Sequence, residues 1–169
     1  FTVRSIVCIF FRCRRDRDRF GRFSAPFSGQ VFGKTFLSEA IGQEILKKGN
    51  TVLYQTAPKL LSKLMEYKVL DIKKYNELND FLSTVDLLIL DDFGSENITE
   101  AKKEEVLNII NGRIYNEKAM IISTNLGLKD IYKVYTDRVF SRIIGEFKGY
   151  NFKGADIRIL KAKEQREVG

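Results

Sequence analysis

Residues 87–94 read Leu-Leu-Ile-Leu-Asp-Asp-Phe-Gly, and this stretch decides the fold class that the sequence predicts. Four consecutive apolar residues are typical of a strand covered on both faces, as in a parallel α/β sheet. Asp91 and Asp92 follow at the end of the strand, where open α/β sheets bind their ligands. Asp91 can hold Mg²⁺, and Asp92 can orient an attacking water. Taken alone, the stretch is also compatible with a plain turn after a strand.

A second motif, Gly33-Lys34-Thr35, opens a helical pattern after a turn that contains Gly29. Backbone amides of such a loop close around phosphate oxygens, the lysine adds positive charge and the threonine hydroxyl holds Mg²⁺. We therefore expect Gly29, Gly33 and Lys34 to contact phosphate and Thr35 to join Asp91 at the metal. The alternative is a simple turn with Lys34 in solvent, and the pairing with Asp91-Asp92 favours the phosphate site.

This loop departs from the usual pattern, which has four residues between its first glycine and Gly-Lys-Thr. Only Gln-Val-Phe at residues 30–32 separates Gly29 from Gly33, so the loop is one residue short. If Ser28 holds the first position instead, the length is correct and the first glycine is missing. A lost residue would misplace the amides by about 3 Å, the reach of one residue.

A third polar position follows another apolar run, in Ile121-Ile122-Ser123-Thr124-Asn125. The Asn125 amide after a buried strand is well placed to touch a γ-phosphate or the attacking water. A turn or a helix cap that uses the asparagine is the alternative interpretation.

Apolar periodicity around these motifs predicts alternating strands and helices, and thus a parallel α/β sheet. Thr99 is expected to cap the fourth helix. We expect helices over residues 34–48, 58–65, 73–83, 99–116, 130–135 and 136–147, and strands over residues 51–54, 85–90, 119–122 and 155–160.

The composition excludes several classes of site. The 169 residues contain no histidine and only two cysteines, Cys8 and Cys13, which rules out histidine-dependent nucleophiles and zinc sites with histidine or four cysteines. We expect both cysteines to be free thiols in a cytoplasmic protein. No apolar run reaches the roughly 18 residues of a membrane helix, so no membrane partner is expected.

The net charge of +7 is concentrated near the N-terminus. Residues 1–32 hold seven arginines, no lysine and two aspartates, which marks a boundary in composition. Three interpretations of the Arg- and Phe-rich residues 1–22 stay open: a solvated extension, a nucleic-acid arm whose rings stack on bases, or the product of a reading-frame error that is not native to this fold. The apolar run at residues 5–11 is compatible with one buried strand.

Five motifs in this order and spacing resemble the AAA+ ATPase domain of DnaC/DnaI-type replicative helicase loaders, with IstB-type transposition ATPases as close relatives: GKTFLSEAIG, LLILDDFGSE, IISTNLGLKDI, DRVFSRI and GADIRI. The resemblance covers about residues 33–169. It implies a three-layer, parallel-sheet P-loop NTPase core of the AAA+ type over residues 23–169, without a full C-terminal lid. Residues 1–22 do not resemble the helicase-binding region that precedes the core in such loaders.

The resemblance assigns roles to the motif residues. It implies that Lys34 and Thr35 form the Walker A pair, that Asp91 and Asp92 form Walker B, and that Asn125 is sensor 1.

Three arginines receive roles in the same way. Arg142 resembles the arginine finger that reaches the γ-phosphate of a neighbouring subunit. Arg138, one helical turn earlier, is the competing candidate. Arg158 resembles sensor 2. Surface salt bridges are the alternative interpretation of all three arginines.

The implied function is ATP hydrolysis with Mg²⁺, coupled to binding of single-stranded DNA and a hexameric replicative helicase, with self-association through the face that carries Arg142. Two alternatives stay open. One is a non-catalytic AAA+-fold assembly module with a defective phosphate loop, and the other is an IstB-like transposition helper ATPase.

Overall fold

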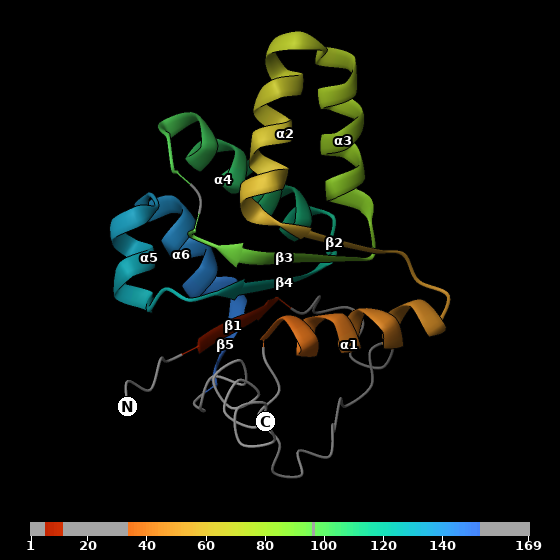
Figure 1. Ribbon diagram of the computed structural model, residues 1–169, viewed down its shortest axis with the longest axis vertical. Helices are drawn as coiled ribbons and strands as arrows, with labels where there is room; N and C mark the ends of the chain where they lie inside the picture. The colour runs from red at the N-terminus through yellow and green to blue at the C-terminus, as the bar shows by residue number, and fades with distance from the viewer. Residues whose placement is uncertain (1–5, 12–33, 96, 153–169) are drawn as a thin grey trace, which may run out of the picture.

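The computed structural model describes residues 6–11, 34–95 and 97–152 of the chain (Figure 1). Their elements are β1 (Ile6–Phe11), α1 (Lys34–Lys47), β2 (Val52–Thr56), α2 (Ala57–Leu70), α3 (Ile72–Thr84), β3 (Leu87–Phe93), α4 (Glu100–Tyr115), β4 (Ala119–Thr124), α5 (Leu128–Val134), α6 (Asp137–Glu146) and β5 (Phe147–Phe152).

One five-stranded sheet forms from these residues, in the order β2-β3-β4-β1-β5. Strand β3 pairs in parallel with β2 and with β4, which confirms the predicted parallel α/β arrangement for these three strands. Strand β1 forms within the apolar run at residues 5–11, which is compatible with a strand, and it runs antiparallel to both β4 and β5. An apolar run predicts that a strand is buried without predicting its direction, which depends on the connections to its neighbours.

The end of the chain differs from the sequence prediction. Helix α6 ends at Glu146, one residue before its predicted end, and residues 147–152 form β5, a strand that the sequence analysis does not predict. Strand β5 lies at the edge of the sheet and pairs along its whole length with the six residues of β1. The strand predicted at residues 155–160 and most of the 1–22 extension lie outside the described residues.

Helix α1 covers one face of the sheet, and the other helices pack on the opposite face (Figure 1). Successive side chains of β3 point to opposite faces of the sheet, so they belong to two different hydrophobic cores. Leu87 and Ile89 pack with Ile45 on the α1 side, whereas Leu88 and Leu90 join the larger core on the other side. Because Asp91 continues the odd-numbered series, its side chain is directed toward α1.

Three of the helices begin at polar caps. The side chains of Asp71, Thr99 and Thr136 accept hydrogen bonds from the backbone amides of Lys74, Lys102 and Val139. This satisfies amide groups that the first turn of a helix leaves unpaired, and it confirms the predicted cap at Thr99. Among the residues that the structure describes, no helix has the length and apolar character needed to cross a membrane.

Asp86, just before β3, forms hydrogen bonds with the residue before β2 and with the residue before β4. Its carboxylate accepts hydrogen bonds from the backbone amide of Thr51 at 3.0 Å, the Thr51 hydroxyl at 2.8 Å and Lys118 Nζ at 2.8 Å. The hydrogen bond from Lys118, followed by those from Thr51, lowers the pKa of Asp86 from its usual 3.8 to about 2.

We expect Asp86→Asn to lower the free energy of unfolding by about 1–2 kcal/mol at pH 7. A lowered pKa means that the fold favours the ionised carboxylate. Its stabilisation is therefore complete above about pH 4 and is lost as the pH falls through about 2. Urea unfolding of both proteins between pH 7 and pH 2 checks this, because the difference should shrink toward the acid end. A difference that stays constant with pH would contradict the assignment.

Candidate functional site

The start of α1 meets the end of β3 at Asp91. Thr35 Oγ1, in the first turn of α1, donates a hydrogen bond of 2.9 Å to Asp91 Oδ2. The two residues are far apart in the sequence, and the packing of α1 against the odd-numbered residues of β3 brings them together. The structure thus brings Thr35 and Asp91 into direct contact.

The Asp91 carboxylate is buried, with 2% of the residue exposed. Tyr54, on β2, donates a second hydrogen bond to Oδ2, at 2.5 Å. Burial raises the pKa of Asp91, but the nearby hydroxyl groups of Ser123, Tyr54 and Thr35 outweigh it and lower the pKa below its usual value. Ser123, on β4, has the largest of these lowering effects on the pKa, although its Oγ and Asp91 Oδ1 do not form a hydrogen bond of ordinary geometry. The fold therefore favours the ionised carboxylate, and its Oδ1 accepts no hydrogen bond of ordinary geometry.

These features fit a magnesium ion bound with phosphate. Mg²⁺ is usually held by one or two protein oxygens, waters and substrate phosphates instead of a complete protein cage. Asp91 offers an ionised carboxylate with an unpaired Oδ1, and Thr35 offers a hydroxyl beside it. No group of three or more His, Cys, Asp or Glu side chains suited to a metal occurs among the described residues, so an all-protein site is not present there.

The side chain of Asp92 is exposed, whereas that of Asp91 is buried. The Asp92 backbone has φ of +52°, a left-handed conformation that is rare for residues other than glycine, and the register of β3 with β4 shifts between Leu90 and Phe93. The resulting bulge leaves the Asp92 side chain exposed while Asp91 stays buried. The two adjacent carboxylates therefore have different surroundings, as different roles would require.

Gly94, just after β3, allows the chain that follows β4 to pack closely against it. It has φ of +87°, and a Cβ at this position would lie 2.3 Å from Leu126 Cδ1. The Thr124 hydroxyl donates to the Phe93 carbonyl and accepts from the Leu126 amide, which fixes the turn after β4. Because Phe93 pairs with Thr124, exposed Asn125 leaves β4 beside the end of β3. Asp92 and Asn125 thus sit at the carboxyl ends of neighbouring strands.

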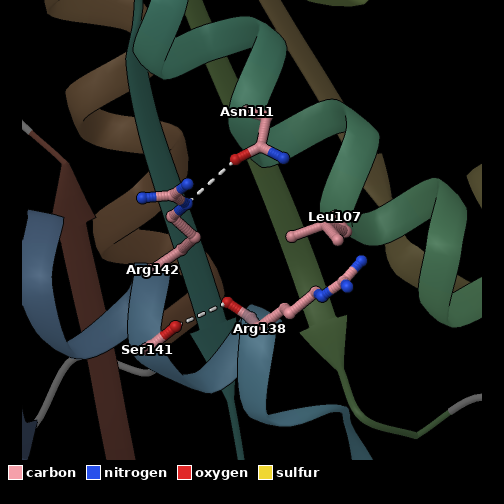
Figure 2. A pocket seen from close by; sticks show the side chains of 5 residues that line it. All are labelled: Leu107, Asn111, Arg138, Ser141 and Arg142. Atoms are coloured by element: carbon pink, nitrogen blue, oxygen red, sulfur yellow. Dashed lines mark hydrogen bonds between the residues drawn. The ribbon is translucent and has the colours of Figure 1, made fainter.

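Arg138 and Arg142 lie in a different part of the molecule, on α6. With Leu107, Asn111 and Ser141 they line a pocket of about 400 Å³ between α6 and α4 (Figure 2). Arg142 Nε donates to Asn111 Oδ1 at 3.1 Å, whereas Arg138 extends away from Asn111. Both arginines are exposed, and neither forms an ion pair with any residue that the structure describes. The salt-bridge interpretation therefore finds no partner within the described ranges.

Other predicted site residues cannot be placed with Asp91. Gly29, Gly33 and Arg158 lie outside the described residues, and Lys34 is described only as the first residue of α1. Conversely, the sequence motifs did not indicate Tyr54. Its only sequence signal is its place on a strand, since Tyr54 pairs with Ile89 and shares the face of β2 that looks toward α1.

The family of IstB-like ATP binding proteins matches residues 27–146. The replicative helicase loader DnaC of Escherichia coli is 32% identical over 121 residues, which cover 69% of this chain and 48% of the loader. The protein y4pL of Sinorhizobium fredii, named for an insertion sequence ATP-binding role, is 28% identical over 131 residues, 75% of this chain and 52% of y4pL. The chain therefore spans about half the length of the curated relatives it matches.

Solved structures agree in fold. A crystal structure of the DnaC helicase loader has a TM-score of 0.59 and 27% identity, with 68% of each chain covered. A structure of the replication initiator DnaA bound to AMPPCP and single-stranded DNA has a TM-score of 0.59 and 31% identity, covering 68% of this chain and 35% of DnaA. The described fold is thus that of AAA+ domains.

Proposed function

The chain belongs to the family of IstB-like ATP-binding proteins, and from this premise we propose that it binds and hydrolyses ATP as an AAA+ ATPase of DNA replication. In this proposal ATP controls binding to single-stranded DNA and to a hexameric replicative helicase, as a helicase loader requires. The similarity to DnaC and to a DNA-bound DnaA supports this choice.

The observation that carries the proposal is the hydrogen bond between Thr35 and Asp91. It joins the first turn of a helix, where amides and positive potential favour phosphate, to a buried carboxylate at the end of a strand. Thr35 and Asp91 would hold Mg²⁺, and Lys34 would pair with the phosphates. Bound Mg²⁺ would stabilise the negative charge that develops on the transferred phosphoryl group.

The other predicted residues have roles that fit their surroundings. Asp92 and Asn125, both exposed at neighbouring strand ends, would orient the attacking water. Gly29 and Gly33 would supply backbone amides to phosphate, and Arg158 would contact the nucleotide as sensor 2. Arg142 would act on the nucleotide of a neighbouring copy of the chain, so a monomer should be nearly inactive.

We expect wild-type protein to bind a fluorescent ATP analogue and Lys34→Ala to bind it about 10–100-fold more weakly. The lysine makes a charge-assisted contact with phosphate, so its loss removes a strong interaction. A titration followed by fluorescence anisotropy checks this. Wild-type affinity weaker than about 1 mM that is unchanged by Lys34→Ala would favour the non-catalytic assembly module, in which a phosphate loop that is one residue short from Gly29, or lacks its first glycine at Ser28, fails to bind ATP.

The family match and the similarity to y4pL favour a second candidate, a transposition helper ATPase. Both functions use the same ATP site, so nucleotide binding does not separate them. Affinity purification of the tagged protein with ATP from its native cells does separate them. Recovery of a replicative helicase supports the loader, and recovery of a transposase instead supports the transposition helper.

A further inference from the structure

Tyr54, which belongs to none of the sequence motifs, contacts the buried carboxylate of Asp91. Its hydroxyl donates to Asp91 Oδ2 at 2.5 Å, and Thr35 donates to the same oxygen at 2.9 Å. Tyr54 belongs to β2, Thr35 to α1 and Asp91 to β3. Oδ2 of Asp91 is therefore held by two donors from two different elements.

The two oxygens of the Asp91 carboxylate therefore differ in their hydrogen bonds. Oδ2 has both donors, and Oδ1 is buried without a hydrogen-bond partner. Turning the carboxylate would break both hydrogen bonds at once, so Oδ1 keeps one direction. The ring of Tyr54 is itself held, because it packs against the cluster that contains Ile45 and Ile89.

We propose that Tyr54 is a positioning residue, which fixes the Asp91 carboxylate so that Oδ1 faces the magnesium ion of bound ATP. The proposal rests on the proposed function, since the metal arrives with the nucleotide. Thr35 alone would serve less well, because its hydroxyl is also expected at the metal. Tyr54 is not expected to bind the metal, so it can keep its hydrogen bond to Oδ2 both before and after ATP and Mg²⁺ bind.

We expect Tyr54→Phe to raise the Mg²⁺ concentration needed for half-maximal binding of a fluorescent ATP analogue by about tenfold, because partners that orient a metal ligand typically contribute 10–100-fold to metal affinity. Binding of the analogue in EDTA should not change, because Tyr54 is not among the residues that we expect to contact phosphate, which are Gly29, Gly33 and Lys34. The variant keeps the ring in its apolar cluster. The urea midpoint without nucleotide checks that it is folded.

Tyr75→Phe is the matched control. The Tyr75 hydroxyl donates at 2.9 Å to Glu105, another buried carboxylate, which also accepts from Lys68. The chemical change is the same, but it lies among α2, α3 and α4, so the Mg²⁺ midpoint should stay at the wild-type value.

The possible failures are distinguishable. If wild-type protein does not bind the analogue at all, the proposed function fails and this inference falls with it. If wild-type protein binds but Tyr54→Phe has the same Mg²⁺ midpoint, the inference alone is overturned. Equal weakening with Mg²⁺ and with EDTA would also overturn it, because that result indicates a general structural role.

Discussion

Arg142→Ala is expected to lower assembly-dependent ATP hydrolysis by about 10³-fold or more while nucleotide affinity stays nearly unchanged. An arginine supplied by a neighbouring subunit stabilises charge that develops only in the transition state. Its loss therefore affects the rate and spares binding. Because Arg142 is exposed on α6, a second copy of the chain can reach it. A 3.1 Å hydrogen bond from its Nε to Asn111 orients the side chain. Steady-state hydrolysis and anisotropy measured on one preparation check both parts.

Arg138→Ala is the matched control, because Arg138 lines the same pocket one helical turn away. A moderate effect at Arg138 and a large one at Arg142 support the assignment. A large loss at Arg138 with little change at Arg142 would transfer the role to Arg138. Loss of ATP binding in Arg142→Ala would contradict a role in the transition state and would assign Arg142 to nucleotide binding.

Arg113→Met is expected to lower the free energy of unfolding by about 3–5 kcal/mol. Arg113 is a buried residue of α4 with 1% of its surface exposed. Its guanidinium donates to the carbonyls of Leu82 at 2.6 Å and Asp86 at 3.3 Å, and also to that of Ala119. It therefore joins the end of α3 to the starts of β3 and β4. Methionine fills similar space but leaves these carbonyls without their donor.

Urea unfolding measures this loss, with Arg138→Met as the control for the same change at an exposed position. The control should stay within about 0.5 kcal/mol of wild type. Burial lowers the pKa of Arg113 to about 10, so the side chain remains charged at neutral pH. A loss below about 1 kcal/mol for Arg113→Met would show that water or other donors replace the guanidinium.

The sequence predicted those parts of the site that follow from periodicity and element ends. The four apolar residues before Asp91 predicted a buried strand, and a Gly-Lys-Thr turn predicted a helix whose first turn binds phosphate. The meeting of Thr35 and Asp91 then follows from the geometry of α/β sheets, in which ligands bind at the carboxyl ends of the strands.

Other features depend on side-chain reach and chain direction, which periodicity does not encode. No sequence motif marks Tyr54 or Arg113, although both donate hydrogen bonds to groups distant in sequence. The left-handed backbone of Asp92 arises from the bulge where β3 loses register with β4. The antiparallel direction of β1 likewise depends on its partners in the sheet.

The central claim is that one ATP molecule and its metal bind where the start of α1 meets the end of β3. Its most direct test is a titration of wild-type protein with a fluorescent ATP analogue, first with Mg²⁺ and then with EDTA. We expect saturable binding that weakens by about tenfold or more when EDTA removes the metal. Binding that is absent, or equally strong in Mg²⁺ and in EDTA, would contradict it.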